Sequence, residues 1–550
     1  MYLKKYKNSL RLLLLALAFA QLTQAQDKVY IFPDQNSYVS GDTVWFSTVI
    51  VHEQENAGNN VVHLQLDDTG NRHITSVAVL CKNEQGEGYL PIPDSLSTGI
   101  YLLKAFTNGP RQTIYQRLLT VYNRFDEEFI QIKAPETSGI QQFSKFENVH
   151  ISTDKDTIGA RENVNVKIEI PASECSNLSR LIITVGLSDP SSEDWNPAFI
   201  PAMEKKGSNT SVSMPEKDGV LVNGKVFSKT NQANVARAIV LLSIPDTIPY
   251  FDYCVSDSAG MFSFFLQNAT GTGNLVLQAR SENCGECEIK LFENYIETEE
   301  LPVTDPKPFT YEQKNFAEAV INASYFEKLF FGYKLPPTAP FSIPVEFKYP
   351  FYGEPTTTVY PELFTDLPNF TEVSRELLHG VQYREKKDET SIWMYNYGSN
   401  YMFNEEPLKL LDGIPVFDPH VFSKMGSSDI KKIDEVFYER YFGDIAFQGV
   451  LAVYSKNHSL SWIENTPGMQ LFSYPCLQTP VSRRFDETPK GKSNLPDFRK
   501  TYYRNSTDQI KTLNEFSFQT SDIKGNIVIR VIAITRQNQI LYTRKILETR

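Results

Sequence analysis

The sequence Asp27-Lys-Val-Tyr-Ile-Phe-Pro-Asp-Gln-Asn-Ser-Tyr-Val-Ser-Gly-Asp-Thr-Val-Trp-Phe46 indicates which class of fold the chain adopts. It contains two runs of β-branched and aromatic residues, 29–32 and 43–51, the second of which extends past the quoted stretch. Pro, Asn, Gly and Asp separate the runs, as is typical of short strands joined by turns. The same succession of short apolar runs and turn residues continues to residue 122. Strands at this spacing predict an antiparallel β-sandwich.

The composition agrees with a globular, β-rich protein. Hydrophobic residues make up 41% of the 550 residues and charged residues 22%, which is ordinary for folded domains. At roughly 100–150 residues per domain, this length gives about four or five folded units. The 54 Lys and Arg against 66 Asp and Glu leave a formal charge of −12, which argues against a nucleic-acid or anionic-membrane partner. The 36 Phe and 28 Tyr against 4 Trp favour β-rich cores.

The first 25 residues have the three parts of a cleaved secretory signal. A basic start, Lys4 to Arg11, precedes the apolar run Leu12 to Ala20, and the small residues Thr23 and Ala25 follow. The apolar run is too short to cross a hydrocarbon layer about 30 Å thick. We therefore expect an exported protein.

Export leads to an oxidising compartment, in which cysteines can pair. The six cysteines are Cys81, Cys175, Cys254, Cys284, Cys287 and Cys476. Their spacing does not choose among the possible pairings, and they are too sparse to be the framework of the fold.

Two separated motifs resemble macroglobulin-type domains of large envelope proteins of the Bacteroidetes. Residues 27–46 resemble the opening strands of that domain, and Leu90 to Asn108 resemble its closing strands. The resemblance implies that Tyr38 and Trp45 fill the sandwich core.

The segment at residues 145–205 has a shorter pattern of alternating strands, but its few strands are not enough for a second sandwich. We therefore expect contacts between residues 164–188 and 516–546, with the middle of the chain inserted between them.

Residues 219–297 resemble the carboxypeptidase regulatory-like, or transthyretin-like, sandwich, an accessory fold without catalytic residues. Asp257 and Gly260 occupy the positions of the family's turn residues, and Ser258-Ala-Gly260 predicts a hairpin. The next segment is Pro-rich at both ends, and residues 311–331 within it have helical spacing.

Three segments in order resemble the plug domain of TonB-dependent outer-membrane receptors. They are Leu411-Asp-Gly-Ile-Pro415, Asp429 to Val436, and Tyr441 to Lys456. The match departs from the family between Gly443 and Gly449, where the family has Ser-Arg-Gly-Ala. Only 94 residues follow Lys456, too few for a barrel of about 22 strands, so no membrane barrel is expected in this chain.

The segment Asn283-Cys-Gly-Glu-Cys287 resembles the thioester motif Cys-Gly-Glu-Gln, but Cys287 replaces the Gln that supplies the acyl group. A disulfide or inert thiols are the favoured interpretation, and a redox or metal role stays open. His52-Glu53 lacks the second His of a zincin, and Gly491-Lys-Ser493 lacks the first Gly of a P-loop.

The predicted fold is multidomain and mainly β, with Ig/macroglobulin-like and transthyretin-like β-sandwiches and an α+β plug-like domain. The predicted domains are a signal peptide (1–25), a macroglobulin-like β-sandwich (26–125), a second Ig/macroglobulin-like segment (145–205), a carboxypeptidase regulatory-like sandwich (219–297), a linker with one helix (298–345), a TonB-receptor plug-like α+β domain (346–456) and C-terminal β strands (495–550) that complete the second sandwich.

These features predict a non-catalytic modular protein of the periplasm or the outer-membrane periphery. Its expected partners are proteins, among them an outer-membrane β-barrel, or polysaccharide, bound through sandwich edges and loops. No nucleic acid, no cofactor and no catalytic or metal-binding residue is predicted, and membrane association is expected only through a partner. Two alternatives stay open: an accessory of a TonB-dependent transport system, and a hydrolase with an unrecognised site.

Overall fold

The structure is a computed structural model, and its strands dominate the chain, which confirms the mainly β class. It describes residues 28–51, 60–108, 113–126, 131–132, 143–190, 198–201, 215–246, 248–282, 284–298, 307–331, 341–344, 348–386, 389–463, 466, 468–479 and 495–550. The predicted signal peptide, His52, Asn283 and residues 491–493 lie outside these ranges. Within them, no helix has the length and hydropathy that a membrane crossing requires.

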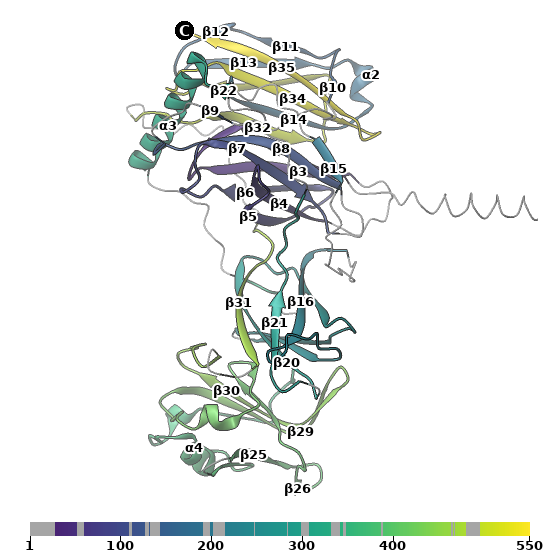
Figure 1. Ribbon diagram of the computed structural model, residues 1–550, viewed down its shortest axis with the longest axis vertical. Helices are drawn as coiled ribbons and strands as arrows, with labels where there is room; N and C mark the ends of the chain where they lie inside the picture. Colours follow the sequence, from purple (N-terminus) through teal and green to yellow (C-terminus); the bar gives the residue numbers. More distant parts are fainter. Residues whose placement is uncertain are drawn as a thin grey trace, which may run out of the picture. The chain divides into compact units, whose positions relative to one another are not determined.

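The chain divides into two compact units (Figure 1). Unit 1 comprises Met1–Asp218, Asn294–Thr338 and Leu477–Arg550, and unit 2 comprises Gly219–Glu293 and Ala339–Cys476.

The first sandwich of unit 1 packs a three-stranded sheet against a larger one. The small sheet has the order β1 (Lys28–Pro33), β3 (Thr43–Val51), β6 (Gln85–Pro91). The large sheet has the order β15 (Ala198–Pro201), β8 (Thr113–Tyr122), β7 (Gly99–Phe106), β4 (Val61–Asp68), β5 (His73–Leu80), with β2 (Ser37–Val39) parallel to β8. Residues 198–201 thus pair with the first sandwich rather than with the second segment, in which the sequence placed them.

The core of this sandwich contains one of the two aromatic residues expected there. Tyr38 lies in the main apolar cluster. Trp45 is buried outside that cluster, where its ring centroid lies 5.4 Å from that of Tyr89. Alternation along β3 explains the difference, because Val44 and Phe46 face the core and Trp45 faces the other side.

The second sandwich of unit 1 is built from two distant parts of the chain, residues 144–187 and 501–549. One sheet has the order β11 (His150–Thr153), β13 (Asn163–Glu169), β33 (Leu513–Gln519). The other has the order β10 (Ser144–Lys145), β35 (Ile540–Thr549), β34 (Ile527–Thr535), β14 (Leu178–Leu187), β32 (Thr501–Thr507), with β12 (Thr157–Ile158) beside β35. The expected contact between residues 164–188 and 516–546 is present, since Val166 pairs with Phe516 and Ile183 with Val531.

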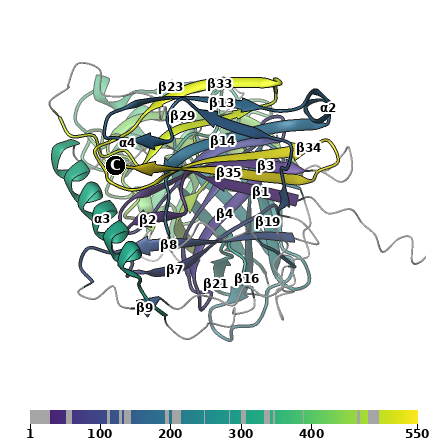
Figure 2. The same cartoon turned by 90° about the horizontal axis from the view of Figure 1, so that it is seen from above.

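Helix α3 (Tyr311–Phe331) has the predicted bounds and is part of unit 1. Phe316, Ala317, Val320 and Ile321 form its buried face and belong to the core cluster of the second sandwich. The helix runs along one side of unit 1, next to β2 and β8 (Figure 2). Unit 1 also contains β9 (Gln131–Ile132), β22 (Lys307–Pro308) and the short α2 (Ala172–Cys175).

Unit 2 contains a second kind of sandwich. One sheet has the order β19 (Met261–Gln267), β16 (Gly219–Ser228), β21 (Cys287–Leu291), and the other β18 (Tyr250–Val255), β17 (Ile239–Ile244), β20 (Thr272–Arg280), β31 (Met469–Pro475). The sequence did not predict β31, which comes from far along the chain.

The hairpin predicted at residues 258–260 is wrong, because β18 and β19 belong to different sheets. The segment is a tight turn between the sheets. The Asp257 carboxylate accepts hydrogen bonds from the backbone N–H groups of Ala259 and Met261, each at 2.8 Å, and Gly260 has a φ of 80°.

The rest of unit 2 is an α+β assembly. Its larger sheet has the order β23 (Thr357–Val359), β29 (Ile430–Phe442), β30 (Ile445–Ser455), β27 (Leu408–Leu411), β28 (Ile414–Pro415). A small sheet has the order β24 (Val381–Lys386), β25 (Glu389–Asn396), β26 (Tyr401–Met402), and the remaining elements are α4 (Phe370–Leu377), η1 (Pro361–Leu363) and η2 (Pro419–Phe422).

Helix α4 and the small sheet pack on one face of the larger sheet (Figure 1). The Asn369 side chain caps the helix by accepting a hydrogen bond from the Glu372 N–H at 3.0 Å. The helix ends at Leu377.

Candidate functional site

The C-terminal half of α3 has a second apolar face, which is exposed. Tyr325, Phe326, Leu329 and Phe330 are 44%, 39%, 64% and 52% exposed. Residues four positions apart are neighbours on a helix surface, so Tyr325 adjoins Leu329 and Phe326 adjoins Phe330. A helix that covers a core normally has polar residues on its opposite side. Contiguous exposed apolar residues of this kind mark interaction sites.

Phe498 extends this face from a distant part of the chain. Its ring lies 5.9 Å from that of Phe326 in a stacked arrangement and 6.3 Å from that of Phe330. Aromatic pairs at such separations stabilise one another by about 0.5–1.5 kcal/mol beyond the burial of their area. Phe498 is therefore held against the helix before any partner binds.

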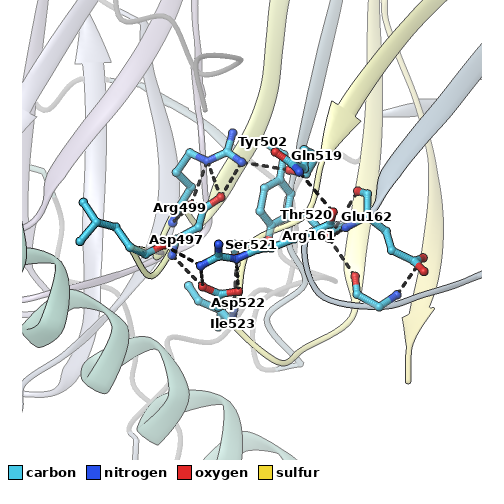
Figure 3. A network of polar contacts seen from close by, with 12 residues as sticks. Arg161, Glu162, Asp497, Arg499, Tyr502, Gln519, Thr520, Ser521, Asp522 and Ile523 are labelled. Carbon is cyan, nitrogen blue, oxygen red and sulfur yellow. Dashed lines mark hydrogen bonds and ion pairs between the residues drawn. The ribbon is translucent and has the colours of Figure 1, made fainter. Parts of the chain in front are cut away.

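A polar network fixes the backbone around Phe498 (Figure 3). The Arg161 guanidinium donates to both carboxylate oxygens of Asp522, at 2.7 and 2.6 Å. The Asp497 N–H donates to Asp522 Oδ2 at 2.8 Å, and the Arg499 guanidinium donates to the Asp497 carboxylate at 2.7–3.1 Å. Bidentate Arg–carboxylate pairs are strong and directional. The hydrogen bond from Arg161 lowers the pKa of Asp522, so Asp522 stays ionised.

Arg124 and Phe125 form the other side of the surface. The Arg124 guanidinium lies 4.4 Å from the centre of the Phe125 ring and 5.1 Å from that of Tyr325. Such cation–π contacts hold a guanidinium flat against a ring. Phe125 is 70% exposed. We define the α3 surface as Arg124, Phe125, Tyr325, Phe326, Leu329, Phe330 and Phe498.

Hydrogen bonds anchor α3 to the loop between β2 and β3. The Ser324 hydroxyl donates to Asp42 Oδ1 at 2.7 Å, and Lys328 Nζ donates to the Ser40 carbonyl at 3.2 Å. Lys500 also pairs with Asp42. Burial by itself would raise the pKa of Asp42, but Lys500 and Ser324 outweigh it and lower the pKa. Asp42 is thus an ionised carboxylate that binds Ser324 of α3 and Lys500 of a second segment.

The cysteines, which the sequence singled out, are all free thiols. Cys284 Sγ lies 3.0 Å from the Glu286 carbonyl oxygen. Burial, with smaller contributions from Cys284, raises the pKa of Cys287 to about 12. A redox dithiol needs a lowered thiol pKa, so this shift favours the inert-thiol interpretation.

Acidic and basic side chains also line the outer face of β4. His63 Nε2 lies 2.5 Å from Glu216 Oε2, and Lys104 Nζ lies 2.6 Å from Asp67 Oδ2. His73 Nδ1 is 3.3 Å from Asp67 Oδ1, and its ring stacks on Tyr295. His63, Glu216, Lys104 and Asp67 are buried and paired, and His73 is partly exposed at the edge of the group. Such pairing of buried polar groups is typical of a structural network.

Among the described residues of unit 2, Glu435 is a buried carboxyl group with one unsatisfied oxygen. Glu435 is 2% exposed, and its Oε1 has no hydrogen-bond partner. Burial raises the pKa of Glu435 to about 7. The neighbouring Asp434, by contrast, accepts hydrogen bonds from Tyr352, Thr358 and Lys432. No group of three or more His, Cys, Asp or Glu with metal-binding geometry occurs in the described ranges.

Comparison with known proteins gives little more than a general likeness. No family model matches the chain, and no curated protein matches it. Similar solved structures include a trypsin-activated alpha-2-macroglobulin from Escherichia coli (9% identity, TM-score 0.23, covering 96% of this chain and 42% of that one). A Salmonella alpha-2-macroglobulin reacted with methylamine has 8% identity and a TM-score of 0.23, covering 95% of this chain and 39% of that one. The chain therefore spans about two fifths of their length. Overlaps with TM-scores this low do not establish a shared function.

The sequence contained a signal for the α3 surface that periodicity analysis of the helix missed. The helical spacing of residues 311–331 is that of Phe316, Val320, Ala323 and Glu327, a face of which most is buried. The two aromatic–apolar pairs four residues apart form a second stripe, which a search for two apolar faces would have found. No pattern links Phe498 or Arg124 to the helix.

Proposed function

We propose that this chain is a non-catalytic, modular, exported protein that binds another protein through the α3 surface. The observation that carries the proposal is the exposed aromatic face of α3, which residues from two other segments, 124–125 and 498, extend. Preorganised aromatic and Arg side chains are the groups that contribute most to binding energy at protein interfaces. Because their positions are already fixed, binding loses little conformational entropy.

A non-catalytic role is supported by the state of the reactive groups. The buried acids and bases beside β4 are paired with one another. Glu435 has a raised pKa, as a general acid would, but its burial keeps it from substrate. A hydrolase would need a site made from residues other than these.

The signal-like first 25 residues and the resemblance to Bacteroidetes envelope proteins support a location in the periplasm or at the outer-membrane periphery. Cell fractionation, with protease treatment of intact cells, tests this part of the proposal. Recovery of the protein in the cytoplasmic fraction would contradict it.

The binding role is tested with Leu329→Glu, which places a charge in the middle of the α3 surface. The matched control is Leu513→Glu, an exposed leucine on β33 of the same unit. Quantitative mass spectrometry of proteins that co-purify from envelope extracts should show a partner that wild type and control retain. We expect Leu329→Glu to reduce its yield about tenfold or more. Equal yields with all three proteins would overturn the proposal.

A second candidate function is that of an accessory to TonB-dependent transport, acting through the plug-like part of unit 2. The mixed sheet supports it, since β27 runs parallel to β30 and the Asp412 carboxylate accepts hydrogen bonds from Ser455 at 2.8 and 2.6 Å. It requires an outer-membrane transporter that co-purifies at near-stoichiometric yield. It also requires that this capture be unaffected by Leu329→Glu.

A further inference from the structure

We infer that the α3 surface recognises a peptide segment in which an Asp or Glu lies next to a bulky apolar side chain, and that Arg124 binds the carboxylate. This inference rests on the proposed function of the same surface and names the chemistry of its partner. Arg124 differs from the other cations nearby in its contacts.

The other cations that the structure describes around the surface are paired with carboxylates. Lys328 lies 3.5 Å from Asp94 and Arg499 lies 2.7 Å from Asp497. Lys500 pairs with Asp42, and Arg161 with Asp522. These cations are therefore committed to holding unit 1 together.

Arg124 makes no such pair in the part of the chain that the structure describes. Its contacts there are the faces of Phe125 and Tyr325. The closest acid in sequence, Asp126, accepts a hydrogen bond from the Thr98 N–H at 2.5 Å. Stacking leaves the N–H groups at the edge of the guanidinium directed outward, where they match the two oxygens of a carboxylate.

The apolar half of the site lies beside this guanidinium. Tyr325 contacts Arg124 and is followed one turn later by Leu329, while Phe330 and Phe498 continue the surface. An apolar side chain placed on these rings brings an adjacent acidic residue within reach of Arg124. The two halves together specify an apolar–acidic segment, because each alone would accept many ligands.

A protein partner fits this chemistry better than a lipid surface. Binding to anionic lipid headgroups depends on several unpaired basic residues, each adding about 1 kcal/mol. The α3 surface offers one guanidinium, that of Arg124, with which no carboxylate of the described residues pairs, and Glu327 lies within the same helical stretch. A single oriented guanidinium suits a single carboxylate.

The test uses the full chain without its first 25 residues and an array of 12-residue peptides, acetylated at the N-terminus and amidated at the C-terminus. Their only carboxylates are then those of Asp and Glu. We expect wild type to enrich peptides with an acid adjacent to Phe, Leu, Ile or Trp. Arg124→Gln should weaken the best peptide about tenfold to hundredfold, because a charge-assisted hydrogen bond is lost. Replacing the acid of that peptide by its amide should weaken wild type equally and Arg124→Gln hardly at all.

The matched control is Arg72→Gln, since Arg72 is an exposed arginine of unit 1 that pairs with Asp68. It should bind like wild type, and thermal unfolding should show all variants folded. The inference would be overturned if the enriched peptides showed no preference for acids, or if Arg124→Gln bound the best peptide as tightly as wild type. Neither result would affect the proposed function, as long as Leu329→Glu still reduces capture of the partner. If Leu329→Glu captured the partner as well as wild type does, the proposed function itself would be overturned. Binding only to anionic vesicles, and not to peptides, would also overturn the inference.

Discussion

Lys104 Nζ lies 2.6 Å from Asp67 Oδ2, and the two side chains are 0% and 1% exposed. Lys104 also donates to Asn71 Oδ1 at 2.7 Å, and the Gln65 amide donates to Asp67 at 2.7 Å. Asn71 in turn contacts Thr298, so the pair helps to hold the segment at residues 294–298 on this face of the sheet.

Removing one member of this pair should be costly, because it leaves a charge buried without a partner. We expect Lys104→Met to lower the free energy of unfolding of unit 1 by about 3–5 kcal/mol. The double variant Lys104→Met with Asp67→Asn should recover part of that loss. Urea unfolding measures both values, with Lys82→Met at an exposed position as the control. A single variant as stable as the control would refute this account of the pair.

The pKa of Glu435 predicts a pH dependence of unit 2. Burial raises this pKa from 4.5 to about 7, so the folded state binds a proton that the unfolded state releases between these values. Stability is therefore fully present below about pH 4.5 and falls as the pH rises through about 7, by about 3 kcal/mol at most.

Glu435→Gln removes the titrating group and should flatten this part of the profile. Thermal unfolding at several pH values from 4.5 to 8 measures the difference between wild type and variant. Glu405→Gln, on an exposed glutamate of the same unit, should keep the wild-type slope. Parallel profiles for wild type and Glu435→Gln would show that Glu435 titrates normally.

Phe498 and Phe326 should be energetically coupled through their stacked rings. In a double-mutant cycle with Phe498→Ala and Phe326→Ala, we expect a coupling of about 1 kcal/mol in the stability of unit 1. Phe498→Ala should also weaken capture of the partner. A coupling near zero would mean that the contact between the two rings does not hold Phe498 against α3.

Four of the free cysteines should react slowly in the folded protein. Burial raises the pKa of Cys81, Cys254, Cys287 and Cys476 to about 12, so almost no thiolate is present at neutral pH. We expect iodoacetamide labelling at pH 7.5 to be slow at these positions and to become fast in denaturant. Fast labelling of Cys287 in the native protein would restore the redox interpretation of the Cys284–Cys287 segment.

Local features of the fold could be predicted from the sequence alone. The strand runs near the N-terminus, helix 311–331 and the turn at Asp257 follow from alternation, helical spacing and turn chemistry, which depend on residues close together in the chain. The incomplete second segment also predicted its partner strands, because three strands cannot bury their apolar face alone.

The tertiary structure decided which distant edges meet. It placed β31 beside β20, moved residues 198–201 into the first sandwich, and brought Phe498 and Arg124 to α3. Strand edges offer the same backbone donors and acceptors whatever their sequence, so the choice of neighbour depends on how the whole chain buries its apolar faces. The α3 surface exists only because that choice left one aromatic face of a core helix uncovered.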